Sequence, residues 1–125
     1  MVRALVIDDS KAIRGLLKRE LVHLGFEVHE AANGQEGMAR LAELGPVDVA
    51  LVDWTMPVMD GLSFLKEVRA NPEYERVLVV MVTSESDPAQ IFQALMAGAD
   101  EYATKPITAA ALAEKLGLVG LSGGE

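Results

Sequence analysis

The chain of 125 residues contains no cysteine, which excludes disulfide bonds, thiolate metal sites and cysteine nucleophiles. It also lacks any apolar run near the ~18 residues that span a membrane, and its first apolar stretch is too short for a signal peptide. Basic residues are few: the chain has 11 Lys and Arg but 19 Asp and Glu, which gives a net charge of −8. This charge argues against a surface for nucleic acid or for an anionic membrane. It favours soluble protein partners and cations, and the missing cysteines are compatible with the cytoplasm.

The hydrophobic fraction of 50% is sufficient for a core and argues against disorder. The length suits a single domain, and the sequence contains neither an internal repeat nor a linker. We therefore expect one domain over residues 1–121 and a flexible tail over residues 122–125.

Short apolar runs rich in β-branched residues alternate with segments of helical periodicity. Continuous runs of this kind are typical of strands that are buried on both faces of a parallel sheet. Strands are expected at residues 4–7, 26–30, 47–52, 77–82 and 101–104. Helices are expected after the capping residues Ser10, Asn33, Asp60, Asp87 and Thr108, and the last is expected to run through Leu116. Five strand–helix units in a row predict a doubly wound α/β domain with five parallel strands and five helices.

Ligands of doubly wound sheets bind beyond the carboxyl ends of the strands, so the residues that follow each strand are the candidates for a site. Asp8 and Asp9 follow the first strand, Asp53 follows the third and Lys105 follows the fifth. If the first and third strands are neighbours, three carboxylates crowd together, and each pair ~5 Å apart repels by roughly 1–3 kcal/mol. Lys105 supplies one positive charge. A divalent cation is expected to supply the rest, and a site of oxygen ligands favours Mg²⁺.

A carboxylate beside Mg²⁺ is suited to phosphoryl transfer, because this reaction needs mainly positioned groups and neutralised oxygen charge. Asp53 would attack phosphorus and form an acyl phosphate. Lys105 and the hydroxyl of Thr83 would bind two phosphoryl oxygens, and Ser84 is small enough for its backbone N–H to approach a third.

Four motifs stand at the strand ends in chain order: DDS at 8–10, VDWTMPVMDG at 52–61, VTS at 82–84 and YATKP at 102–106. Together they resemble the receiver domain of two-component response regulators over nearly the whole chain. The Asp-Trp-x-Met-Pro run is most similar to the chemotaxis members of that family. The resemblance implies a flavodoxin-like fold with strand order 2-1-3-4-5 and a phosphorylation-activated switch that acts in the cytoplasm with Mg²⁺ as cofactor.

The resemblance also implies how the transfer site works. Asp53 would accept the phosphoryl group from a phosphohistidine on a sensor histidine kinase, and Mg²⁺ would be held by Asp8, Asp9, Asp53 and the backbone carbonyl of Thr55. The protein would catalyse its own phosphorylation and dephosphorylation, with no independent metabolic activity.

The implied output depends on Thr83 and Tyr102. Thr83 would move toward the phosphoryl group and Tyr102 would turn inward, so that the face of the fourth helix, fifth strand and fifth helix changes its affinity for a downstream protein. The chain would be a monomer or a phosphorylation-dependent dimer. Members of the family commonly have a cis peptide bond at the position of Lys105–Pro106.

Several alternatives stay open at this point. A small Mg²⁺-dependent aspartyl-phosphate phosphohydrolase would need a second acid two residues after the first-strand nucleophile, where this chain has Ser10. A flavodoxin would need an uncharged loop after the first strand, and a degenerate receiver would lack some of the required side chains. The chain is either a stand-alone regulator or the receiver part of a longer one.

The resemblance also implies that Thr55 and Glu85 occupy the positions at which family members tune the lifetime of the phosphorylated state.

Overall fold

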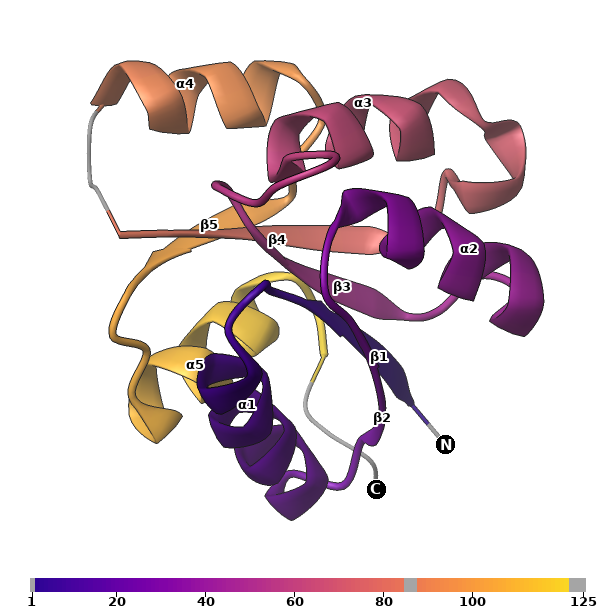
Figure 1. The fold of residues 1–125 in the computed structure, drawn as a ribbon. Helices are drawn as coiled ribbons and strands as arrows, with labels where there is room; N and C mark the ends of the chain where they lie inside the picture. The colour runs from indigo at the N-terminus through magenta and orange to yellow at the C-terminus, as the bar shows by residue number, and fades with distance from the viewer. Residues whose placement is uncertain (1, 85–87, 122–125) are drawn as a thin grey trace.

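The computed structural model describes residues 2–84 and 88–121. Five parallel strands form one sheet in the order β2-β1-β3-β4-β5, as the resemblance implied (Figure 1). The strands are β1 (Arg3–Ile7), β2 (Glu27–Ala31), β3 (Val49–Asp53), β4 (Leu78–Thr83) and β5 (Glu101–Thr104). Their bounds differ from the predicted ones by no more than two residues. The predicted tail at 122–125 and the predicted cap Asp87 lie outside the described residues.

Helices cover both faces of this sheet (Figure 1). Helices α1 (Lys11–His23) and α5 (Ala109–Leu118) lie on one face. Helices α2 (Gly34–Leu44), α3 (Gly61–Ala70) and α4 (Pro88–Met96) lie on the other. The last helix extends two residues past the predicted end at Leu116. A short 3-10 helix, η1 (Pro72–Tyr74), was not predicted. None of the helices in the described part of the chain is long and apolar enough to cross a membrane.

The alternation along each strand divides the core into two layers. Leu5, Ile7 and Val52 point toward α2, α3 and α4, where they pack with Phe64 and Leu41. The intervening strand residues point toward α1 and α5, where the packed side chains are Ala4, Val6, Leu51, Leu17, Leu21, Leu112 and Leu116. Because the strands are buried on both faces, their sequences are continuously apolar rather than alternating.

Four helix starts carry the predicted caps. The side chains of Ser10, Asn33, Asp60 and Thr108 each accept a hydrogen bond from a backbone N–H three residues further on. Asn33 and Glu36 form only half of a capping box, because the Glu36 side chain accepts from the N–H of Ala32 instead of that of Asn33. The loops from β1 to α1 and from β2 to α2 are short, whereas residues 54–60 form a longer loop between β3 and α3 at the edge of the sheet that carries the predicted site.

Candidate functional site

Three carboxylates meet at the carboxyl ends of β1 and β3. The two strands are neighbours, with Ile7 paired to Val52, so Asp8 and Asp9 directly after β1 lie beside Asp53 at the end of β3. One oxygen from each of the three acids lies within 4.8 Å of the other two. Asp8 and Asp53 are buried, with 1% and 6% of their surface exposed, and Asp9 is exposed to solvent.

The ammonium group of Lys105 enters this cluster from the end of β5. Its Nζ lies 2.9 Å from Oδ2 of Asp8 and 3.1 Å from Oδ1 of Asp53. The peptide bond between Lys105 and Pro106 is cis, as the resemblance implied. The structure thus brings together the four charged side chains that the strand ends predicted to meet.

Burial and the neighbouring charges in the cluster shift the pKa values of Asp53 and Lys105. Burial, together with the negative charge of Asp8, raises the pKa of Asp53 above its ordinary value, although Lys105 acts in the opposite direction. Burial by itself would lower the pKa of Lys105, but the carboxylates of Asp8 and Asp53 outweigh it and raise that pKa. One lysine therefore does not compensate for three acids.

The donor set fits a small divalent cation. An octahedral Mg²⁺ holds oxygens at about 2.1 Å, so two of its ligand atoms are at most about 4.2 Å apart. Adjacent ligands are about 3.0 Å apart, so the oxygens of the three acids, now within 4.8 Å of one another, would move closer together around the ion. Within the described residues, Oδ2 of Asp8 is buried and receives no well-aligned hydrogen bond, although it pairs with Lys105. A buried carboxylate oxygen in this situation is suited to binding a cation.

The position of Asp53 is set by backbone packing behind it. The N–H of Trp54 donates to the carbonyl of Val82 on β4, and the N–H of Gly61 donates to the carbonyl of Trp54. A Cβ atom at Gly61 would overlap the carbonyl oxygen of Asp53. Only glycine allows α3 to begin this close to the end of β3, so Gly61 helps to define where the acid lies.

The loop after β1 is held by contacts that the sequence analysis missed. Oδ1 of Asp8 accepts a hydrogen bond from the N–H of Ser10 at 2.9 Å, which leaves Oδ2 turned toward Lys105. The guanidinium of Arg14 donates to the backbone carbonyl of Asp8 at 2.6 Å and also bonds Glu30 on β2. No pattern in the sequence indicates this role, because it depends on how α1 lies against β2.

The remaining predicted residues surround the cluster. Thr83 is buried at the end of β4 and Ser84 is exposed directly after it. Thr55 is exposed in the loop that follows Asp53. Tyr102 is half-buried on β5, and the ammonium of Lys115 lies 4.6 Å from the centre of its ring, a cation–π contact that the sequence did not reveal. Glu85 lies outside the described residues.

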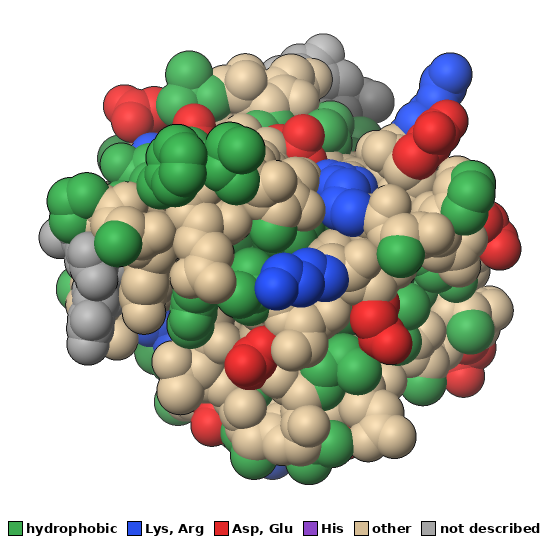
Figure 2. All heavy atoms as spheres, turned by 90° about the horizontal axis from the view of Figure 1, so that it is seen from above, with side chains coloured by type: hydrophobic (Ala, Val, Ile, Leu, Met, Phe, Trp, Pro, Cys, Tyr) green, Lys and Arg blue, Asp and Glu red, His purple; other side chains and the backbone are tan. Residues whose placement is uncertain are grey.

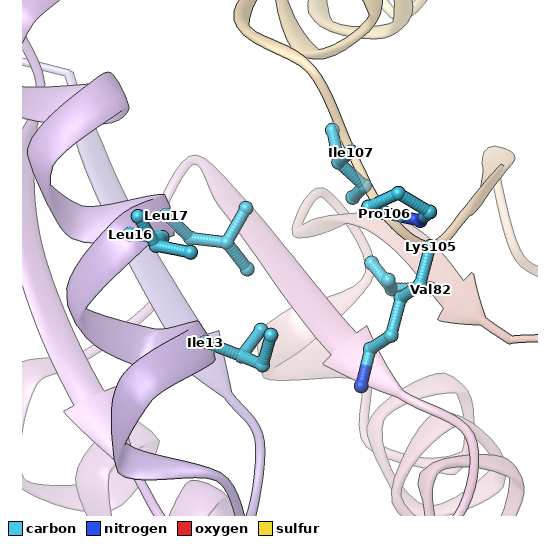
Figure 3. A pocket seen from close by; sticks show the side chains of 7 residues that line it. All are labelled: Ile13, Leu16, Leu17, Val82, Lys105, Pro106 and Ile107. Carbon is cyan, nitrogen blue, oxygen red and sulfur yellow. The ribbon is translucent and has the colours of Figure 1, made fainter.

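An apolar pocket of about 60 Å³ lies beside the cluster, between α1 and the segment that follows β5. In Figure 3, Ile13, Leu16 and Leu17 of α1 face Pro106 and Ile107, and the aliphatic stem of Lys105 lies on the side of Pro106, next to Val82. The stem of the lysine therefore lies against apolar side chains while its ammonium group lies among the carboxylates.

Helix α4 exposes large hydrophobic side chains. Phe92 and Met96 have 64% and 72% of their surface exposed, and Leu95 is also exposed. Figure 2, which looks at the molecule from above relative to Figure 1, shows hydrophobic side chains gathered over α4. Neighbouring surface apolar residues of this kind are typical of a protein interaction site. They form part of the face at which the resemblance placed the output.

The two histidines lie outside this site. His23 is exposed, and His29 contacts Glu27 and Arg40 on the surface of β2 and α2.

Comparison with known proteins is consistent with this geometry. The sequence model of the family described as "Response regulator receiver domain" matches residues 4–117. The "Chemotaxis protein CheY homolog" of Campylobacter jejuni is 40% identical over 99% of this chain and 97% of its own length. "Chemotaxis protein CheY1" of Helicobacter pylori is 39% identical over 94% of this chain and 96% of its own length.

Solved structures show the same fold. Chemotaxis protein CheY4 of Vibrio cholerae superposes with a TM-score of 0.88 at 33% identity, covering 94% of this chain and 97% of that one. A CheY from Borrelia burgdorferi, solved in a CheX-CheY-BeF3-Mg²⁺ complex, has a TM-score of 0.89 at 24% identity, covering 96% of this chain and 90% of that one.

Proposed function

Since this chain belongs to the family of response regulator receiver domains and is a phosphorylation-activated signalling switch, we propose that Asp53 is its phosphoacceptor. The observation that carries this proposal is the meeting of Asp53 with Asp8, Asp9 and the Lys105 ammonium at one end of the sheet. Asp8 also contacts the lysine and belongs to the same cluster. The choice of Asp53 therefore rests on its place in the motif at 52–61, where the resemblance to the family puts the phosphoacceptor. Family membership favours a receiver over the phosphohydrolase and flavodoxin alternatives.

Mg²⁺ would be held by the carboxylates of Asp8, Asp9 and Asp53 and by the backbone carbonyl of Thr55. Bound there, the ion would neutralise charge on the transferring phosphoryl oxygens. The buried Oδ2 of Asp8 supports this assignment, as does the excess of negative charge that Lys105 leaves uncompensated.

The transfer itself forms one bond and breaks another. A carboxylate oxygen of Asp53 attacks phosphorus, and the bond from phosphorus to the imidazole nitrogen of a phosphohistidine breaks with its electron pair left on that nitrogen. Lys105 would bind one phosphoryl oxygen, the hydroxyl of Thr83 a second, and the backbone N–H of Ser84 a third. Hydrolysis of the resulting acyl phosphate by water returns the carboxylate and inorganic phosphate.

The output would run from Thr83 to Tyr102 and then to the surface of α4, β5 and α5. Movement of Thr83 toward the phosphoryl group would let Tyr102 turn inward and reshape that face. Exposed Phe92 and Met96 support a protein partner there. A partner that binds the two shapes with different affinity would then respond to phosphorylation.

The partners of this cycle would be a sensor histidine kinase and a downstream protein, which the exposed apolar side chains on α4 support. We place the cycle in the cytoplasm, where ATP-dependent kinases operate. The domain would occupy residues 1–121, as a monomer or as a phosphorylation-dependent dimer.

Intact-mass spectrometry after incubation with acetyl phosphate and Mg²⁺ tests the proposal. We expect the gain of one phosphoryl group in the wild type and none in Asp53→Asn or in the presence of EDTA. Asp60→Asn is the matched control, because Asp60 is a nearby exposed acid and asparagine also caps helices; this variant should be modified like the wild type. Modification of Asp53→Asn would place the acceptor on another residue.

A further inference from the structure

The loop that carries Asp8 and Asp9 is attached to β2 through both backbone groups of Asp8, its N–H and its carbonyl. The N–H of Asp8 donates to the carbonyl of Ala31 at 3.1 Å. The carbonyl of Asp8 accepts from Nη1 of Arg14 at 2.6 Å, and Nε of the same guanidinium bonds Oε1 of Glu30 at 3.2 Å. Arg14 therefore joins the loop to the strand through two hydrogen bonds from one planar group.

The carbonyl that Arg14 holds belongs to the peptide between Asp8 and Asp9. Its orientation sets the direction in which the backbone of Asp9 leaves, and thus where the Asp9 carboxylate lies. Asp9 is exposed, so core packing does not hold its side chain in place. The direction of the Asp9 side chain consequently depends on the peptide before it.

From these contacts we propose that Arg14 is a positioning residue for the metal site, with Glu30 as its anchor. The inference rests on the proposed function, in which Asp8, Asp9 and Asp53 hold Mg²⁺. Among the contacts of the described residues, the Arg14 side chain bonds the Asp8 carbonyl and Glu30 but no carboxylate of the cluster. It acts through the main chain of Asp8, and a planar guanidinium is suited to this because it can bond the carbonyl and Glu30 at once.

Electrostatics and positioning predict opposite results for the loss of this arginine. Arg14 is a cation beside a cation-binding site, so removing its charge would, by Coulomb's law alone, strengthen Mg²⁺ binding. If Arg14 orients the loop, its removal weakens binding despite that gain. The sign of the change in Mg²⁺ affinity thus separates the two roles.

Lys18 provides a matched control on the same helix. Its Nζ pairs with Oε2 of the same Glu30 at 3.6 Å, and its side chain is half exposed. Among the described contacts, none joins Lys18 to the loop. Like Arg14→Gln, Lys18→Gln removes one positive charge that pairs with Glu30. It leaves the hydrogen bond between Arg14 and the Asp8 carbonyl in place.

The test is a Mg²⁺ titration of the full chain, followed by the fluorescence of Trp54, the single tryptophan. Arg14→Gln should raise the dissociation constant for Mg²⁺ about tenfold, the scale expected for residues that orient metal ligands. Lys18→Gln should leave it unchanged or lower it slightly. Arg14→Lys keeps the charge but has no planar fork, so it should fall between the wild type and Arg14→Gln. Urea unfolding of each variant shows that the folded protein is being titrated.

Titration with Ca²⁺ adds a second measurement, the affinity for Mg²⁺ relative to that for Ca²⁺. A general loss of structure would weaken the binding of both ions and leave this ratio unchanged. Mg²⁺ demands near-ideal octahedral geometry and Ca²⁺ tolerates irregular sites, so a misplaced loop should weaken Mg²⁺ binding more than Ca²⁺ binding. Equal or tighter Mg²⁺ binding by Arg14→Gln, in a wild type that does bind Mg²⁺, overturns the positioning role alone. A wild type that binds no Mg²⁺ overturns the proposed metal site, and this role with it.

Discussion

The ammonium group of Lys105 lies 3.1 Å from Oδ1 of Asp53, although the two residues come from β5 and β3, which are not neighbours in the sheet. The lysine reaches across the end of β4, and its ammonium also lies 2.9 Å from Asp8. It is thus the shared counter-ion of two buried carboxylates, and several consequences can be measured.

Lys105→Met should destabilise the protein when Mg²⁺ is absent. The variant leaves two buried carboxylates without their cation, and an unsatisfied buried group costs about 1–3 kcal/mol. Addition of Mg²⁺ should recover part of this loss, because a metal ion in the cluster supplies the missing positive charge. Urea unfolding with and without Mg²⁺ measures both effects. Lys18→Met, at a half-exposed lysine on α1, serves as the control and should be nearly neutral.

Asp53→Asn should be more stable than the wild type at neutral pH without Mg²⁺. The folded-state pKa of Asp53 is raised by burial and by Asp8, so the folded protein holds its proton more tightly than the unfolded chain. Stability from this group is therefore present at acid pH and is lost as the pH rises through the raised pKa. The advantage of the variant should grow over that same rise and disappear at lower pH. A pH-independent difference in unfolding free energy would contradict this.

Gly61→Ala should destabilise the fold and weaken Mg²⁺ binding together. The added methyl group would overlap the carbonyl oxygen of Asp53, and overpacking of this kind costs about 1–3 kcal/mol. Gly15→Ala makes the same chemical change on an exposed face of α1, where nothing lies within 4 Å of the new atom. That variant should gain about 0.5–1 kcal/mol from better helix propensity. Thermal unfolding of both variants checks the opposite signs.

The ring of Tyr102 should change its environment when Asp53 is phosphorylated. The chain has 2 tyrosines, and Tyr74 is buried in the core, so its signal is an internal control. In fluorotyrosine-labelled protein, ¹⁹F NMR should show a shift of the Tyr102 signal on treatment with acetyl phosphate and Mg²⁺, while the Tyr74 signal stays in place. Thr83→Ala and Lys105→Ala should be phosphorylated without this shift. A full shift in Thr83→Ala would remove the threonine from the switch.

Val58→Asn should stabilise the protein. Val58 has φ of 69°, a left-handed conformation that costs a β-branched residue about 1–2 kcal/mol, and its side chain is 75% exposed, so packing does not compensate. Asparagine tolerates this conformation, and a gain of about 0.5–1 kcal/mol is expected from relief of the strain. The same substitution at Val22, which is exposed on α1, should bring no gain in chemical unfolding.

Much of the fold could be read along the chain because its signals are local. Uninterrupted apolar runs such as residues 77–82 mark strands that are covered on both faces. Caps such as Ser10 and Asp60 mark the starts of helices. The exact ends of the strands were harder to predict. The strand β3 begins at Val49 rather than at Val47, because its start depends on pairing with β1 and β4 and not on hydrophobicity alone.

The residues that form the cluster could be predicted from their positions along the chain. The carboxyl ends of parallel strands share one edge of the sheet, so residues that directly follow strands, such as Asp8, Asp53 and Lys105, converge once the strand order is known. The supporting contacts could not be predicted in this way and are visible only in the folded protein: the guanidinium of Arg14 on the Asp8 carbonyl, the ammonium of Lys115 over Tyr102, and the close approach of Gly61 to Asp53. These contacts depend on the distances and angles at which helices pack against the sheet. Such distances result from the fit of many side chains at once, and no local spacing of residues encodes them.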